Sequence, residues 1–139
     1  MLMPVRRIAE LSATPDRQIR YVLDHDLVPG LDVSKRGRGR SRHYSPFAGF
    51  AIAVAAQLLT AGLPKRLVRN LMLDMGGTRT RRARRSLWRL WNTRNPVESV
   101  YVLNDTIAIR VTLDQLRKDF QNAAGDDAPK IRRRRAVHA

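Results

Sequence analysis

Apolar side chains recur at helical spacing near the start of the chain. Val5, Ile8 and Leu11 are three residues apart, which predicts a short amphipathic helix over residues 4–12. Residues 14–16, Thr-Pro-Asp, have the composition of a helix start, because a hydroxyl can cap the backbone and proline fits the first turn. The apolar face expected for this second helix consists of Ile19, Val22, Leu23 and Leu27. Two short helices this close together have the spacing of a helix-turn-helix.

A basic segment with extended flanks follows the second helix. The extended pieces at residues 31–33 and 42–44 enclose arginines that alternate with glycines over residues 36–40. This pattern predicts a β-hairpin with a basic tip.

Three more helices are expected further along the chain. Residues 45–46, Ser-Pro, repeat the order of cap and proline and predict a third helix, which Gly62 ends. A fourth helix is expected over residues 64–74. The apolar stripe of residues 87–91 predicts one more short helix.

The last third of the chain combines strand and helix patterns. Residues 100–103 and 106–111 predict two strands joined by a turn. Thr112 and Gln115 form a capping-box pattern ahead of a last helix. Beyond residue 125 the chain has no apolar periodicity, so we expect a disordered basic tail.

These elements predict a mainly α protein. A winged helix-turn-helix domain over residues 1–76 is followed, over residues 77–124, by a small C-terminal α/β appendage of helix, β-hairpin and helix that serves oligomerisation. Residues 125–139 form the disordered basic tail.

Charge and composition narrow the function. Lys and Arg total 27 against 12 Asp and Glu, a net charge of +15, and such a field attracts polyanions. The chain has no cysteine, which excludes disulfides and thiolate metal sites and favours a reducing compartment. The longest apolar stretch, residues 47–59, is too short to span a bilayer, and the N-terminus lacks a secretion-signal pattern. We expect a cytoplasmic, nucleoid-associated protein that does not bind membranes.

Enzyme chemistry finds little support in the sequence. His25, His43 and His138 lack the spacing of metal ligands, and no glycine-rich phosphate loop opens a helix. The carboxylates are scattered along the chain. We therefore expect no enzyme activity, no metal and no cofactor.

Several short motifs occur in the order that one bacterial family shows. They are residues 8–11 (Ile-Ala-Glu-Leu), 17–21 (Arg-Gln-Ile-Arg-Tyr), 27–29 (Leu-Val-Pro), 42–45 (Arg-His-Tyr-Ser) and 61–63 (Ala-Gly-Leu), followed by Val68 and Leu71. In this order, residues 4–74 resemble the DNA-binding domain of the MerR family of transcription regulators.

The resemblance implies a regulator whose second helix enters the major groove of DNA. Arg17 and Arg20 match the basic residues of the family's recognition helix, Tyr21 its phosphate-contacting tyrosine and Arg42 its wing arginine. The chain departs from the family pattern at three positions, Val22, Ser41 and Pro64. It also lacks the long dimerisation helix, because Gly76-Gly77 and Asn95-Pro96 bracket too short a segment.

The residues themselves support the same partner, double-stranded DNA. Two arginines on an exposed helix face can read guanine edges or clamp phosphates, and arginines beside glycine can enter a narrow minor groove. The candidate DNA-binding residues are Arg17, Gln18, Arg20, Tyr21, Arg36, Arg38, Arg40, Arg42, His43, Tyr44, Lys65 and Arg66.

Apolar and aromatic residues downstream are candidates for self-association. A stripe of leucine and tryptophan is typical of a core or a subunit interface, and a hairpin edge can pair across a two-fold axis. The candidate oligomerisation residues are Trp88, Trp91, Tyr101, Ile107 and Ile109. We expect a homo-oligomer, with a dimer favoured. No small-molecule effector is expected, because few aromatic residues are present to line a pocket.

Two alternative functions remain open. An excisionase, or recombination directionality factor, can share the winged domain and bends DNA at an attachment site. A basic protein that associates with RNA or the ribosome would also account for the arginine runs, although not for the helix-turn-helix order.

Overall fold

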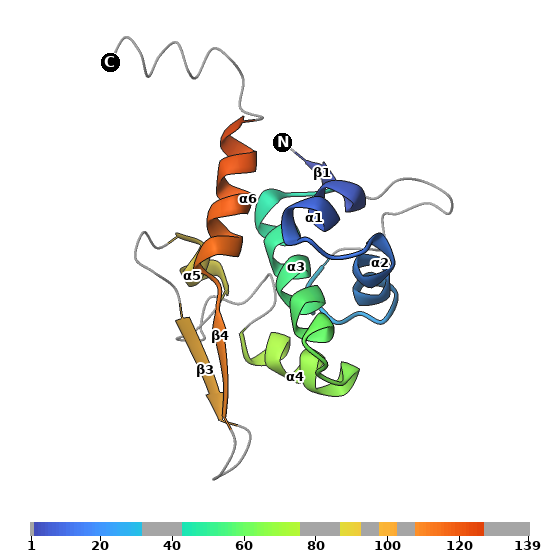
Figure 1. The fold of residues 1–139 in the computed structure, drawn as a ribbon, viewed down its shortest axis with the longest axis vertical. Coiled ribbons are helices and arrows are strands. Elements are labelled where there is room, and N and C mark those ends of the chain that lie inside the picture. Colours follow the sequence, from blue (N-terminus) through green and yellow to red (C-terminus); the bar gives the residue numbers. More distant parts are fainter. Residues whose placement is uncertain (1, 32–42, 76–86, 93–97, 103–107, 127–139) are drawn as a thin grey trace.

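The computed structural model describes residues 2–31, 43–75, 87–92, 98–102 and 108–126. This part of the chain is a small, mainly helical domain with six helices, shown in Figure 1. In chain order its elements are β1 (Met3–Pro4), α1 (Val5–Ser12), α2 (Asp16–Asp24), β2 (His43–Tyr44), α3 (Pro46–Thr60), α4 (Lys65–Asp74), α5 (Leu87–Asn92), β3 (Glu98–Val102), β4 (Ala108–Thr112) and α6 (Asp114–Asp126).

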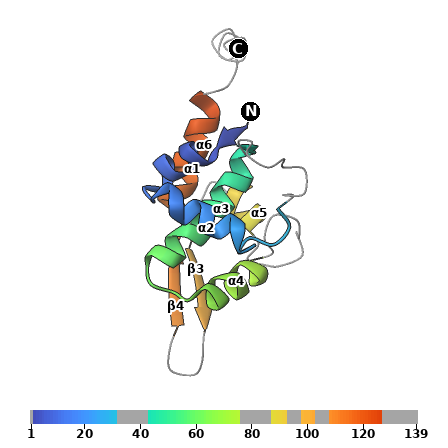
Figure 2. The same ribbon diagram turned by 90° about the vertical axis from the view of Figure 1, so that its right-hand side faces the viewer.

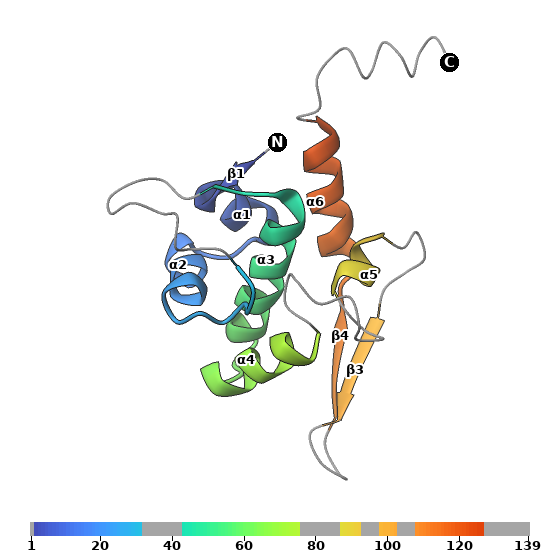
Figure 3. The ribbon, with the colours of Figure 1, turned by 180° about the vertical axis from the view of Figure 1, so that it is seen from behind.

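Helix α3 forms the centre of the fold. It is apolar on nearly every side and is buried from Gly49 to Ala56, as expected for a helix that other helices surround. Helix α2 packs on one side of α3 and α6 on the opposite side, and Figures 1 and 3 show this order from front and back. The Ser45 hydroxyl accepts from the Ala48 backbone N–H at 3.2 Å, and Pro46 occupies the first turn. This start of the third helix was predicted and is confirmed.

The turn between α1 and α2 differs from its prediction in one detail. Ala13 adopts a left-handed conformation with φ of 54°, which ends α1. The Thr14 hydroxyl lies 2.6 Å from the Ser12 hydroxyl, and Pro15 stands at the N-cap of α2 without a side-chain cap. The prediction that Thr14 caps the second helix is therefore wrong: its hydroxyl is buried and bonds within the turn. Gln57 of α3 donates to the Ser12 carbonyl and fastens this turn to the core.

Gly49 marks the place where three elements approach α3 most closely. A Cβ atom on Gly49 would lie 2.8 Å from Met3 Sδ, 3.2 Å from Phe120 Cε2 and 3.3 Å from Ile8 Cγ1. Glycine thus lets β1, α1 and α6 all pack on the same turn of α3.

The C-terminal helix shares the core of the helices before it. Phe120 and Leu113 are buried in the same apolar cluster as Phe50, and the rings of Phe50 and Phe120 lie 6.3 Å apart. Helix α6 begins at Asp114, and Gln115 Nε2 donates to Asp119 Oδ1 at 2.8 Å. The Arg117 backbone N–H donates to the Leu113 carbonyl at 2.9 Å, so Leu113 and not Thr112 stands directly before the helix, and the predicted capping box is wrong.

Strand pairing is partly as predicted. Strands β3 and β4 form the expected antiparallel hairpin, with Val100 opposite Arg110 and Tyr101 opposite Ile109. Strand β2 pairs with β1, so that Tyr44 lies opposite Met3, and the sequence did not predict this pairing. The expected basic hairpin tip lies outside the described residues. No helix in the described part is long and apolar enough to cross a membrane.

Candidate nucleic-acid interface

Helix α2 has one buried face and one basic face. Ile19, Val22 and Leu23 are buried against the core, as their helical spacing predicts. Arg17 and Arg20, one turn apart on the other side, are therefore exposed to solvent. Helix α2 thus presents two cations on a face that no helix of the core covers.

Aromatic side chains extend this exposed face of α2. Tyr21 is 37% exposed, and its ring centroid lies 4.1 Å from that of His25, which is exposed one turn further on. Gln18 is half-buried. His25 was not among the residues predicted to bind DNA, although its spacing of four residues from Tyr21 places both on one helix face.

The first turn of α4 provides a second basic group. Lys65 and Arg66 are exposed, Pro64 precedes them without a side-chain cap, and the first turn of α4 contains no acidic residue. Two cations at the positive end of a helix raise the local potential instead of neutralising it. An anion would be stabilised at this end of α4.

Arg69 connects the two basic groups. Its Nε donates to the Asp26 carbonyl at 3.2 Å, and its Nη2 lies 3.8 Å from Asp26 Oδ2, so the loop that directly follows α2 is joined to α4. Figure 2 shows α2 in front of α3 with α4 below it, on the same side of the molecule. Arg69 was not predicted from the sequence, because a contact across 43 residues leaves no local pattern.

Ion pairing separates the basic residues into two classes. Five of the basic side chains that the structure describes lie within 4 Å of a carboxylate: Arg6, Arg7, Arg69, Arg117 and Lys118. Arg17, Arg20, Lys65 and Arg66 form no ion pair with any described residue. Among the basic side chains that the structure describes, those without a carboxylate partner in the same described part are thus on α2 and at the start of α4.

Residues at the base of the predicted wing divide between surface and core. His43 is exposed, whereas Tyr44 is only 4% exposed and belongs to the apolar core. Successive side chains of a strand point to opposite faces, so the pairing of β2 with β1 turns Tyr44 inward when His43 faces solvent. The assignment of Tyr44 to a DNA-contacting surface is corrected accordingly. Four other candidates, Arg36, Arg38, Arg40 and Arg42, lie outside the described residues.

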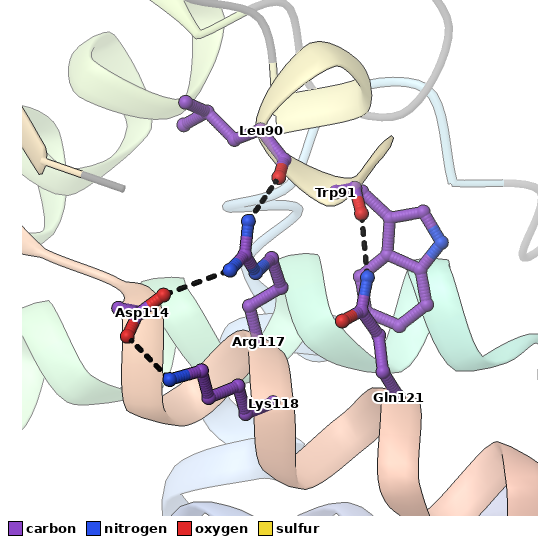
Figure 4. Close-up of polar contacts among 6 residues, drawn as sticks. All are labelled: Leu90, Trp91, Asp114, Arg117, Lys118 and Gln121. Carbon is purple, nitrogen blue, oxygen red and sulfur yellow. Dashed lines mark hydrogen bonds and ion pairs between the residues drawn. The ribbon is translucent and has the colours of Figure 1, made fainter. Parts of the chain in front are cut away.

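The candidate oligomerisation residue Trp91 packs within its own chain. Its ring lies 5.3 Å from that of Phe50 and 5.9 Å from that of Phe47. The Trp91 carbonyl accepts from Gln121 Nε2 at 2.6 Å, as Figure 4 shows. These contacts pack Trp91, which stays partly exposed, against the core of its own chain. Ile107 and the side chains of Trp88, Tyr101 and Ile109 are outside the described part.

Comparison with known proteins gives no family assignment. No protein-family model matches the chain, and no curated protein matches it in sequence. Within the described residues, no three His, Asp or Glu side chains are grouped as metal ligands. The site is thus defined by its own geometry: two exposed cationic groups, on α2 and α4, that form no ion pair with described residues.

Proposed function

We propose that this protein binds double-stranded DNA in a sequence-specific manner and regulates transcription. The observation that carries the proposal is the placement of Arg17, Arg20, Lys65 and Arg66, which are exposed, without a carboxylate partner among described residues, and on two helices joined by Arg69. A basic side chain that is only a solvated surface group can lie anywhere. Their concentration on α2 and the start of α4 supports a polyanionic partner.

Helix α2 acts as the recognition helix in this proposal. An α-helix fits the major groove, and arginine can donate two hydrogen bonds to O6 and N7 of guanine. Arg17 and Arg20 lie one turn apart on the exposed face, so both can reach base edges or adjacent phosphates. Tyr21 lies beside them and can donate to a phosphate oxygen.

Helix α4 and the wing hold the phosphate backbone. Lys65 and Arg66 carry no sequence information there, but they fix the register of α2 on the duplex. The predicted wing, residues 31–44, includes the exposed His43, and in this proposal its arginines would enter a narrow minor groove. This division between base reading and backbone contact is that of a winged helix-turn-helix regulator.

The test measures binding of the full chain to its selected duplex and to a scrambled duplex. The preferred site is first obtained by selection from random duplexes. Arg20→Ala should reduce the preference for that site by about 1–3 kcal/mol, the contribution of one bidentate base contact. Arg6→Ala is the matched control, because Arg6 is also exposed but pairs with Glu10 on α1.

Three results would contradict the proposal. An equal loss on both duplexes would mean that α2 does not read bases. No loss at all would remove α2 from the interface. Tighter binding to a structured RNA competitor than to any duplex would favour the RNA-associated alternative.

A further inference from the structure

The contact between Arg69 and Asp26 joins the turn after α2 directly to α4. Helices α2 and α4 both pack on α3, and in the described part of the chain they make no extensive contact with each other. Arg69 Nε donates to the Asp26 carbonyl at 3.2 Å, and Arg69 Nη2 lies 3.8 Å from Asp26 Oδ2. One planar guanidinium thus holds both the backbone and the side chain of the same residue, which restricts its position more than a single contact would.

Asp26 adopts a backbone conformation that few residues other than glycine adopt. Its φ is 52°, and the N–H groups of Asp26 and Leu27 donate to carbonyls in the last turn of α2. Glycine is the usual residue at this position, because a side chain there costs free energy. Ala13 and Gly62 occupy the equivalent positions after α1 and α3. Of these three residues, Asp26 alone has a side chain that can reach another helix, and it does so through Arg69.

The Arg69–Asp26 contact lies between the two groups of cations that define the candidate interface. Lys65 and Arg66 lie one turn before Arg69 on α4, and the two cations of α2 lie on the helix that Asp26 follows. A contact at this place fixes the separation of the two groups. A double helix has phosphates at fixed positions, whereas a flexible single strand can adapt to other separations. Groups that are already held in the bound arrangement bind more tightly, because less ordering is left for the binding step.

We infer that the Arg69–Asp26 contact makes the interface selective for a rigid double helix over flexible polyanions. Asp26 and Arg69 are positioning residues, since they act through the cations of α2 and α4. The inference rests on the proposed function, which is DNA binding by this face. Charge alone predicts the opposite effect for Asp26, because loss of its carboxylate adds one to the net charge of +15 and strengthens binding to every polyanion.

The ratio of duplex affinity to single-strand affinity tests this selectivity. Full-length variants are titrated with the selected duplex and with an oligothymidylate strand of the same length, at one salt concentration. Asp26→Gly removes the carboxylate and tolerates the left-handed backbone, and it should lower the ratio by about two- to fivefold, the range expected for an exposed ion pair. Arg69→Lys preserves the charge but not the planar pair of donors, and it should lower the ratio by a similar factor. The double variant should show no further fall, because both substitutions break the same contact.

Two matched controls separate the side effects of Asp26→Gly. Ala13→Gly relieves the same backbone conformation after α1, so it should raise the thermal midpoint and leave the ratio unchanged. Glu10→Gln removes an exposed carboxylate that pairs with Arg6 and Arg7, so it should strengthen binding to both nucleic acids alike. Binding is measured below the thermal midpoint of every variant, as followed by circular dichroism.

Failure of the inference and failure of the proposed function give different results. If the unmodified chain prefers the duplex, an unchanged ratio in Asp26→Gly or in Arg69→Lys would overturn the inference alone, as would an equal fall in either control. Additive falls in the double variant would mean that each side chain contacts DNA by itself, which also overturns it. If the unmodified chain binds the single strand as tightly as the duplex, the proposed function fails together with the inference.

Discussion

Helices α2 and α6 pack on opposite sides of α3, and both carry arginine, but their arginines have opposite environments. Arg17 and Arg20 of α2 are exposed and pair with no described carboxylate. Arg117 of α6 is 2% exposed, and its Nη2 lies 2.8 Å from Asp114 Oδ1. Sequence composition counts all three equally toward the net charge of +15.

The contrast shows which part of the charge is available to a partner. Figure 4 shows Arg117 Nη1 donating to the Leu90 carbonyl, near the carbonyl that Gln121 binds, so α6 satisfies the free carbonyls at the end of α5. The Arg117 side chain thus stabilises the fold and is not available to a partner. Arg17 and Arg20 of α2 form no ion pair in the described part of the chain, and this difference is the physical reason for placing the interface on α2.

The largest expected effect is that of Arg117→Ala on stability. The substitution leaves the Leu90 carbonyl without this donor and Asp114 without its shortest ion pair. Removing one partner of a buried ion pair costs about 3–5 kcal/mol of unfolding free energy. Urea unfolding, followed by circular dichroism, measures the change.

Lys118→Ala is the matched control for that measurement. Lys118 Nζ lies 3.1 Å from the same carboxylate, but its side chain is exposed, so the loss should be at most about 1 kcal/mol. Arg17→Ala should leave stability within about 0.5 kcal/mol. If all three variants were equally stable, the proposed difference between the buried, paired Arg117 and the exposed Arg17 would be wrong.

A smaller loss is expected from Gly49→Ala, which tests whether α6 folds together with α1 and α3. The new methyl group would meet Met3 Sδ and the Phe120 ring at less than normal contact distances. Overpacking of this kind costs about 1–3 kcal/mol. Thermal unfolding should keep a single transition at lower temperature.

Gly125→Ala supplies the opposite control on α6 itself. A Cβ there meets no atom within 4 Å, and alanine favours a helix over glycine by at most about 1 kcal/mol. The variant should therefore be as stable as the parent chain or slightly more stable. Two separate transitions in Gly49→Ala would instead indicate that α6 unfolds independently.

Local patterns predicted the helices well and the long-range contacts poorly. The spacing of apolar residues placed both ends of α1, α3 and α4 within about two residues, because each helix buries one stripe or its whole surface. The predicted end of the second helix was wrong: α2 stops at Asp24, and Leu27 is buried beyond it. Strands β1 and β2 have two residues each, too few to show any alternation, so their pairing was missed.

In the candidate site too, local patterns predicted some residues correctly, and residues that depend on long-range contacts were missed. Arg17, Arg20, Lys65 and Arg66 are exposed, as helical periodicity predicts. Tyr44 was misplaced, because its direction depends on the unpredicted partner β1. One signal was overlooked: Arg117 falls between Leu113 and Phe120 at helical spacing, so it lies on the apolar face of α6.

The smallest effect on stability, and the sharpest on function, is expected for the double variant Lys65→Ala/Arg66→Ala. Both side chains are exposed and unpaired with described residues, so the unfolding free energy should change by less than about 0.5 kcal/mol. Each phosphate contact releases counterions, so its loss should flatten the slope of log affinity against log salt by nearly one unit. A salt series on the selected and scrambled duplexes measures this slope.

Lys118→Ala again provides the comparison, now for binding. Lys118 is also cationic and exposed, but it lies on α6 and pairs with Asp114, so its removal should leave the salt slope unchanged. The double variant should weaken binding to both duplexes alike, because backbone contacts carry no sequence information. An equal change of slope in Lys118→Ala would mean that the net charge of the whole chain governs binding. The face formed by α2 and α4 would then have no special part in it.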